Sequence, residues 1–329
     1  MKLWLVGYAI LTLKIAGILT GVLVLAAYLV LLERKLLGRF QARIGPNRAG
    51  IFGLLQPIAD GIKLLAKEDV VPGGAERWIF LFAPVMVAST ALLTFAVVPF
   101  GPDLTIGDRK IPMVVTDMNV GLLYVFAMAS LSVYGVVLGG WASNSKYPLF
   151  GSIRGAAQMI SYELALGLSI VPVVMLAGSF SLVDIINAQA GLPFILVQPL
   201  AFAIFFIAAV AESKRIPFDL PEAEAELGSG YHTEYSGMRF GLFFLGEYVQ
   251  MQVLGALVAV FFLGGWRGPL LPAPLWLLVK MLIVVIAMIW IRATLPRFRY
   301  DQLMILGWKF LIPAALINIV ITGFIVVWV

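Results

Sequence analysis

Residues 3–32, LWLVGYAILTLKIAGILTGVLVLAAYLVLL, form an apolar stretch in which Lys14 is the only charged residue. A helix of about 20 residues crosses the roughly 30 Å hydrocarbon core of a bilayer, so this stretch is long enough to span it. It is also too long for the hydrophobic region of a signal peptide. We therefore expect a transmembrane helix here rather than a cleaved leader.

The rest of the chain has the same character. Hydrophobic residues make up 61% of the 329 residues and charged residues 12%, whereas soluble proteins average about a quarter charged. The apolar stretches lack the alternation of barrel strands, which favours helices. We predict an all-α integral membrane protein, a single polytopic domain over residues 1–329 with about eight transmembrane helices. The expected spans are residues 3–32, 78–100, 118–141, 156–177, 194–212, 239–264, 274–293 and 304–328.

Several kinds of chemistry are excluded by composition. The chain has no cysteine and one histidine, His232, so disulfides, thiolate metal sites, iron–sulfur ligation and a cysteine nucleophile are ruled out. We expect His232 to be a polar loop residue and predict no metal site. The sequence contains no P-loop, GxGxxG or HExxH motif, so no nucleotide site is predicted. It also lacks the paired half-sequence repeat of many transporters.

The basic residues predict the orientation. Sixteen of the 23 Lys and Arg residues follow the odd-numbered spans, and only four lie on the opposite side. Because basic loops stay in the cytoplasm, we expect those loops to be cytoplasmic and both termini to lie outside. The loop of residues 33–77 alone contains eight basic residues, namely Arg34, Lys35, Arg39, Arg43, Arg48, Lys63, Lys67 and Arg77.

Three loops carry local structure signals. Within the basic loop, the apolar residues between Ile51 and Lys67 recur at helical spacing. They predict an amphipathic helix on the membrane surface, with Pro57 at a kink or at the start of its regular part. A helix that only covers the bundle fits the same pattern. Residues 101–117 predict a hairpin or an irregular cap, and residues 179–193 one short helix.

An acidic stretch at residues 211–247 contains seven of the 18 acidic residues. Unpaired ionised carboxylates are not tolerated in hydrocarbon. Its central part, residues 212–238, is therefore either a solvated cytoplasmic loop or the lining of a polar cavity in which carboxylates exchange protons. Glu222, Glu224 and Glu226 recur at every second residue, so in an extended segment they share one side. Like charges so arranged titrate as a coupled set.

Glu163 is the sharpest single candidate. It follows Arg154 by about two helical turns and therefore falls inside the fourth span. A carboxylate within the membrane indicates function. The alternative is a structural role as a hydrogen-bond or salt-bridge partner, for instance of an arginine such as Arg292.

Four motifs then resemble a known family. They are residues 33–69 (ERKLLGRFQARIGPNRAGIFGLLQPIADGIKLLAKED), 151–167 (GSIRGAAQMISYELALG), 211–248 (AESKRIPFDLPEAEAELGSGYHTEYSGMRFGLFFLGEY) and 292–318, which begins RATLPRFRYDQLM. In this order they resemble the quinone-channel membrane subunit of respiratory complex I, the NADH-quinone oxidoreductase. The resemblance covers essentially the whole chain.

The resemblance implies a function and a set of residues. It implies a membrane subunit of a proton-pumping translocase in a bacterial cell membrane, with quinone as the substrate. The quinone tunnel would include Glu33, Arg34, Asp60, Arg292 and Arg297. The proton path would include Glu163, Glu212, Glu222, Glu224, Glu226 and Glu247. No catalytic residue is assigned, because in this family the Tyr and His that bind the quinone head belong to a peripheral partner.

The same resemblance implies the partners. They are the peripheral-arm subunits, which hold FMN, iron–sulfur clusters and the quinone-head site, and adjacent small membrane subunits. No tightly bound cofactor is expected in this chain, and no nucleic acid. Two alternatives stay open: the homologous subunit of a ferredoxin-dependent complex or membrane-bound hydrogenase, and a free-standing proton or cation transporter. The large charged loops disfavour the transporter.

Overall fold

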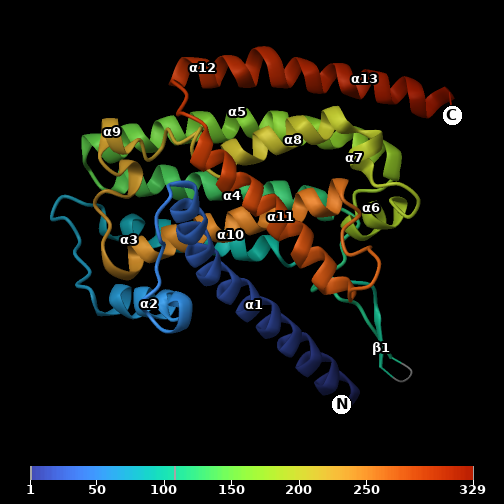
Figure 1. Cartoon of the computed structure of the whole chain (residues 1–329), viewed down its shortest axis with the longest axis horizontal. Helices are drawn as coiled ribbons and strands as arrows, with labels where there is room; N and C mark the ends of the chain where they lie inside the picture. The colour runs from blue at the N-terminus through green and yellow to red at the C-terminus, as the bar shows by residue number, and fades with distance from the viewer. Residues whose placement is uncertain (1, 107–108, 329) are drawn as a thin grey trace.

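The computed structural model describes residues 2–106 and 109–328, without the side chains of residues 2–7, 9, 106, 109, 224 and 225. Helices dominate it (Figure 1). In chain order the elements are α1 (Lys2–Phe40), η1 (Ile51–Gly53), α2 (Gln56–Ala66), α3 (Arg77–Thr94), β1 (Leu104–Ile106), β2 (Arg109–Ile111), α4 (Gly121–Ala142), α5 (Lys146–Ala177), α6 (Leu182–Ala188), α7 (Phe194–Val197), α8 (Pro199–Glu212), α9 (Glu224–Leu227), η2 (Gly230–His232), α10 (Gly237–Phe262), α11 (Ala273–Thr294), α12 (Tyr300–Ile305), η3 (Leu306–Leu311) and α13 (Ile312–Trp328).

Within the described residues, seven helices are long and apolar enough to cross a membrane: α1, α3, α4, α5, α10, α11 and the continuous helix from α12 to α13. The predicted all-α membrane class is confirmed. The predicted span at 194–212 differs, because Gln198 leaves helical geometry at φ −128° and ψ 57° and separates α7 from α8. Pro199 follows it, and proline disfavours a helical conformation in the preceding residue. The Gln198 side chain instead binds Thr322 and Asn318 of α13.

The positions of the termini bear on the number of times that the chain crosses the bundle. Both chain ends lie at the same end of the bundle, and α2 and α9 lie toward the other end (Figure 1). Two ends on one side require an even number of crossings. The seven long helices leave one crossing to the broken span, where the 14-residue helix α8 is too short to cross on its own and follows α7; the eighth crossing stays a prediction.

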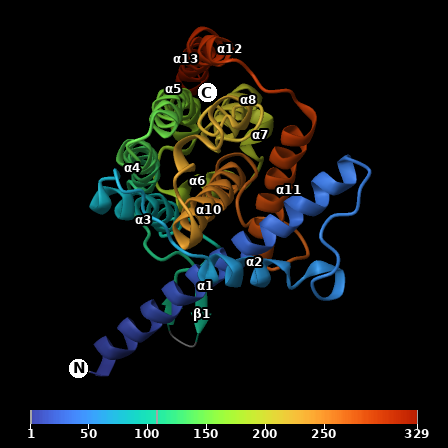
Figure 2. The same ribbon diagram turned by 90° about the vertical axis from the view of Figure 1, so that its left-hand side faces the viewer.

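Helix α10 lies at the centre of the bundle. Figure 2 shows it enclosed by neighbouring helices, and it contacts α1, α3, α8 and α11. Glycines let the backbones approach closely: a Cβ atom at Gly246 would meet Val87 Cγ1 at 2.8 Å, and one at Gly255 would meet Met281 Cγ at 3.1 Å. At the edge of the bundle, α13 packs on α5 and α8.

The predicted surface helix is present as η1 and α2. Pro57 lies in the first turn of α2, where its missing N–H removes no helical hydrogen bond, so it starts the regular part as predicted. The apolar side chains of this segment are exposed, among them Ile51, Ile58 and Leu65. A helix with an exposed apolar face of this kind fits the interface of a bilayer.

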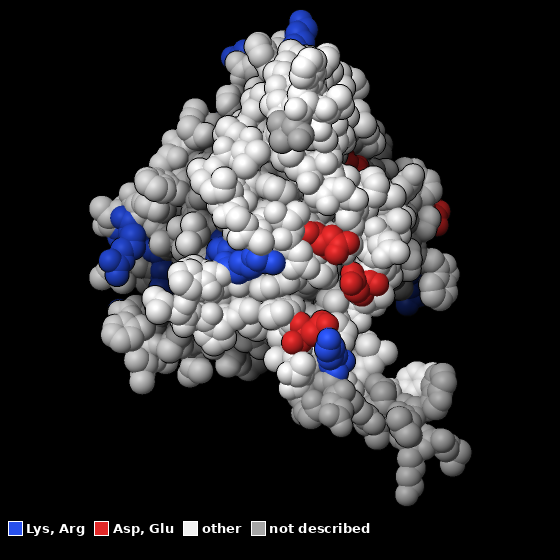
Figure 3. Space-filling view, turned by 90° about the vertical axis from the view of Figure 1, so that its right-hand side faces the viewer, with Lys and Arg blue, Asp and Glu red and all other residues white. Residues whose placement is uncertain are grey.

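At the end of the bundle that holds the termini, two further predictions are confirmed. Strands β1 and β2 form an antiparallel hairpin in which Leu104 pairs with Ile111. Helix α6 is the short helix expected within residues 179–193. Lys and Arg are scattered on this face of the molecule (Figure 3). Which side of the membrane this face occupies stays a prediction from the basic loops.

Candidate functional site

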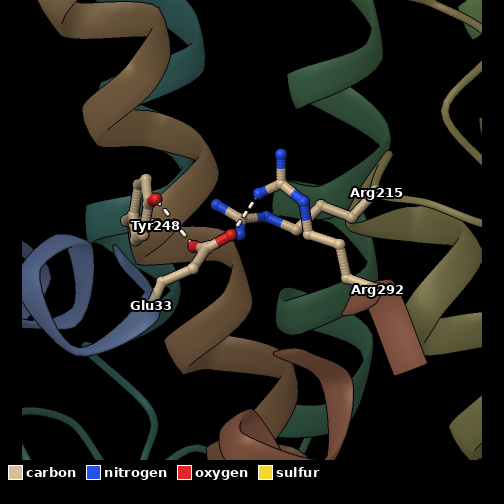
Figure 4. Close-up of polar contacts among 4 residues, drawn as sticks. All are labelled: Glu33, Arg215, Tyr248 and Arg292. Carbon is tan, nitrogen blue, oxygen red and sulfur yellow. Dashed lines mark hydrogen bonds and ion pairs between the residues drawn. The ribbon is translucent and has the colours of Figure 1, made fainter. Parts of the chain in front are cut away.

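A buried carboxylate joins four elements at the cytoplasm-predicted end of the bundle. Glu33, in the last third of α1, is 2% exposed and forms ion pairs with Arg215, in the loop after α8, and Arg292, in the last turn of α11. The Tyr248 hydroxyl of α10 donates a hydrogen bond to Glu33 at 2.7 Å. Figure 4 shows these four residues, the Glu33 cluster, pointing toward one another.

The Glu33 cluster carries more positive than negative charge. One carboxylate faces two guanidinium groups, and the Arg215 guanidinium also lies over the Tyr248 ring, 4.5 Å from its centroid. Burying charges is costly unless each is paired and hydrogen-bonded. Glu33 satisfies this condition. One positive charge is left over within the four residues of the cluster, and the charge of Glu247 acts on Arg215 from outside it.

A second ion pair attaches the surface helix. Arg34 follows Glu33 on α1 but turns outward, and its Nη1 lies 2.7 Å from Asp60 Oδ2 of α2. Gln56 also donates to Asp60, at 3.0 Å. Four of the five residues predicted for the tunnel therefore form two ion pairs, one between α1 and α11 and one between α1 and α2. Arg297 differs, because it lies in the segment after α11 and its charge acts on Glu226.

A polar cavity of about 170 Å³ begins beside the cluster. Arg215 and Arg292 line it together with Lys214, Glu222 and Glu247. Glu222 and Glu247 share a hydrogen bond, which requires one proton between the two carboxyl groups. Burial, and then the charge of Glu247, raise the pKa of Glu222 well above its ordinary value.

Lys214 is a second buried cation of this cavity, beside Arg215. Its side chain is 5% exposed, and its ammonium lies 5.5 Å from the centroid of the Tyr231 ring. The Tyr231 hydroxyl in turn donates to Glu247 at 3.3 Å. Burial lowers the pKa of Lys214, against the opposing charges of Glu247, Glu212 and Glu222.

Two much smaller cavities continue from this one into the bundle. A space of about 10 Å³ is lined by Lys214 and Glu247, which also line the polar cavity, and by Glu212 and Gln250. Glu212 and Gln250 also line the next space, of about 20 Å³, together with Glu163. The cavities thus share walls, and Asp219 and four glutamates line them. We call Glu222, Glu247, Glu212 and Glu163 the carboxylate series.

The inner half of the series is sparsely hydrogen-bonded. Glu163 accepts a hydrogen bond from the Ser130 hydroxyl of α4. It does not pair with Arg292, the arginine considered from the sequence, because Arg292 is bound to Glu33. Glu212 is 3% exposed, and within the described part of the chain its Oε2 atom has no hydrogen-bond partner.

The structure does not bring all six predicted carboxylates together. The side chain of Glu226 is 56% exposed and pairs with Arg154 at 2.6 Å on the surface; this hydrogen bond lowers the pKa of Glu226. The side chain of Glu224 lies outside the described residues. The extended row considered for Glu222, Glu224 and Glu226 is wrong, because Ala223 adopts a left-handed conformation at φ 38° and residues 224–227 form a helical turn.

Sequence reasoning missed three residues of this site: Arg215, Tyr248 and Lys214. Arg215 and Lys214 counted only as loop charges, although each lies within three residues of Glu212. His232 lines the polar cavity and packs against the Tyr231 ring, with 4.9 Å between ring centroids. Among residues 2–106 and 109–328, no group of three side chains is suited to hold a metal ion.

Fold and site together define a polytopic helical membrane protein with a buried charge cluster at one end and carboxylates leading from it into the bundle. A model of the NADH dehydrogenase family matches residues 13–323, and the chain belongs to this family. A protein of Syntrophobacter fumaroxidans, named as the second H subunit of NADH-quinone oxidoreductase, is 70% identical over 325 residues, covering 99% of this chain and 98% of the relative.

Two further relatives are also named as H subunits of NADH-quinone oxidoreductase. The Syntrophotalea carbinolica protein, named as the H subunit of NADH-quinone oxidoreductase, is 60% identical over 319 residues, with 97% of each chain covered. The Geobacter sulfurreducens protein, named as the second H subunit of the same enzyme, is 63% identical over 316 residues, with 96% of each covered. The family resemblance carried by the four sequence motifs is confirmed.

Proposed function

We propose that this chain is the membrane subunit of a proton-pumping NADH:quinone oxidoreductase that forms the quinone tunnel and couples quinone reduction to proton translocation. The observation that carries the proposal is the connection between the Glu33 cluster and the carboxylate series through shared cavity walls. A charge change at one end can therefore act on protons at the other.

The quinone side of the proposal rests on the Glu33 cluster. Quinone becomes quinol by taking up two electrons, supplied by an iron–sulfur cluster of a partner subunit, and two protons. The electrons add negative charge close to the tunnel, and the excess positive charge of Arg215 and Arg292 attracts it. Interactions between charges are strong in such a buried site. Arg215 and Arg292 also line the polar cavity, so their reorientation changes the field at Glu222 and Glu247.

The proton side rests on the carboxylate series. The proton shared by Glu222 and Glu247 is the first that the altered field can displace. Lys214 lies at the wall common to the first two cavities, where its ammonium favours the ionised form of either neighbour. Glu212 then accepts the proton and passes it toward Glu163, inside the bundle. Carboxylates that interact with one another titrate as a set, so a change in the electric field around them redistributes protons among all of them.

We infer the partners that surround this chain from the charge of its loops. The basic loop of residues 33–77 and the acidic loop of residues 212–238 face the cytoplasm, with both termini outside. There they hold the peripheral arm, whose subunits contain FMN, the iron–sulfur clusters and the quinone-head site. Small membrane subunits adjoin the bundle. This chain contributes no redox centre to the complex.

The experiment that tests the proposal replaces Glu163 by Gln, which keeps its size and removes its titration. Quinone reduction and proton pumping are measured in membranes and normalised to assembled complex. Both activities should fall together, on the order of 100-fold, the usual contribution of one proton-transfer group. Glu226→Gln is the matched control, because Glu226 lies on the surface away from the series, and its activities should not change. Full coupled activity of the Glu163 variant would remove the series from the mechanism.

A further inference from the structure

A large apolar slot lies apart from the charged site. It has a volume of about 470 Å³ and is bounded by α1, α10, α11 and the hairpin β1–β2 with the segment after it. Along α1 it extends from Lys14 to Leu25, about 16 Å at 1.5 Å per residue. One leaflet of the hydrocarbon core is about 15 Å thick. The slot is therefore as long as one leaflet is deep.

One wall of the slot is bare backbone. Gly17 and Gly21 lie one helical turn apart on α1 and both line the slot. A Cβ atom built on either glycine meets no atom within 4 Å. Apolar side chains such as Leu25, Phe95 and Leu277 form much of the remaining lining. This shape fits a narrow flexible chain lying against α1.

The end of the slot nearest the N-terminus is cationic. The Lys14 ammonium donates to the carbonyl oxygens of Pro112 at 3.2 Å and Val114 at 2.6 Å. An ammonium has three donors, so in the described part of the chain one donor of Lys14 remains for a ligand. An anionic group matches this end, and a hydrocarbon chain matches the rest.

We propose that the slot binds a phospholipid, with one acyl chain against Gly17 and Gly21 and the phosphate at Lys14. A phosphate just beyond the hydrocarbon and a chain one leaflet deep are the dimensions of a bilayer lipid. A quinone matches less well, because its head is uncharged and would leave Lys14 without an anionic partner. This site is independent of the proposed quinone tunnel.

The test compares two variants of the whole complex, purified in mild detergent and washed. Gly17→Leu combined with Gly21→Leu fills the slot from two positions at which a Cβ atom meets nothing within 4 Å. Gly167→Leu is the matched control, because Gly167 is a glycine of α5 whose Cβ atom also meets nothing within 4 Å. Mass spectrometry then counts phospholipid and quinone per complex. The slot variant should lose one phospholipid, and the control should lose none.

A second variant keeps the proposal testable if the filled slot hinders assembly. Lys14→Gln leaves the shape of the slot unchanged and removes its cation, so the same phospholipid should be lost on washing more readily than from the parent complex. Equal phospholipid in the parent complex and both slot variants overturns the proposal. The proposal is also overturned if the slot variant loses quinone in place of phospholipid. It is likewise overturned if a cross-linker attached at residue 21 of α1 captures a partner polypeptide in the slot.

Discussion

Arg292 forms an ion pair with Glu33 across a sequence separation of 259 residues, and it thereby fixes the end of α11 to the end of α1. Arg215 completes the arrangement from the loop after α8. One buried carboxylate thus holds together three segments that approach the same end of the bundle. The adjacent polar cavity takes part of its wall from the same two arginines.

The first prediction is that Glu33→Gln destabilises the complex strongly. It leaves Arg215 buried without its anionic partner, and breaking a buried pair in this way costs about 3–5 kcal/mol. Tyr248→Phe should cost less, about 1.5–3 kcal/mol, because it removes one hydrogen bond to a charged group and keeps the ring beneath Arg215. The measurement is the yield and thermal midpoint of the assembled complex. Equal effects of Glu33→Gln and the surface variant Glu226→Gln would contradict the prediction.

The second prediction concerns pH and Glu222. Its folded-state pKa is raised, so above the unfolded pKa the folded protein holds a proton that the unfolded chain has released. Stability therefore falls as pH rises from the unfolded pKa toward the folded one. Glu222→Gln removes this term, so the thermal midpoint of the variant should rise relative to that of the parent as the pH increases above the model-peptide value of 4.5.

Lys214 supplies the control for that experiment. Its pKa is lowered from the model-peptide value of 10.5, so its contribution to stability rises with pH up to that value, opposite in sign to the contribution of Glu222. Lys214→Met should remove this rise on the alkaline side. A parallel pH dependence in parent and Glu222→Gln complexes would show that Glu222 titrates at its ordinary pKa.

The third prediction tests the close packing of α10. Gly246→Ala places a Cβ atom 2.8 Å from Val87 Cγ1, so either the Val87 side chain or the packing of α3 on α10 must shift. Overpacking of this kind costs about 1–3 kcal/mol. The same substitution at Gly167 meets no atom within 4 Å and serves as the control. The thermal midpoint of purified Gly246→Ala should be lower than that of purified Gly167→Ala, and equal midpoints would argue against the contact.

The fourth prediction concerns sidedness. Tags placed at Ser145, between α4 and α5, and at Ser229, between α9 and η2, should be accessible from the cytoplasm. A tag after the last residue of α13, Trp328, should be accessible from outside. A cytoplasmic location for the C-terminal tag, with Ser145 and Ser229 still accessible from the cytoplasm, would mean that the spans have been miscounted.

The elements of the fold were predictable because the bilayer sets their lengths. A sequence window long and apolar enough to cross has few alternatives to a helix, and the hairpin and the surface helix follow from equally local patterns. The break at Gln198 was not predictable. Its side chain gains two hydrogen bonds from α13, more than 100 residues away in sequence.

The site was predictable as a set of charged residues but not as a set of pairs. Glu33 and Glu163 were predicted as site residues before any contact was known. The partners of Glu33 come from three other elements, so no local spacing identifies Arg215 or Tyr248. The left-handed conformation of Ala223 likewise depends on its buried surroundings, and it separates Glu222 from Glu226.

The narrowest cavity of the series has a further consequence for energy conservation. About 10 Å³ lies between Lys214 and Glu212, which is at the lower limit of the space that a single water needs. A wide column of water there would conduct protons back down the membrane potential, which is worth about 2.3 kcal/mol per charge for each 100 mV. In the function proposed above, a passage of this size keeps a conducting column of water from forming between turnovers, so that protons cross in step with quinone chemistry and are not lost as leak current.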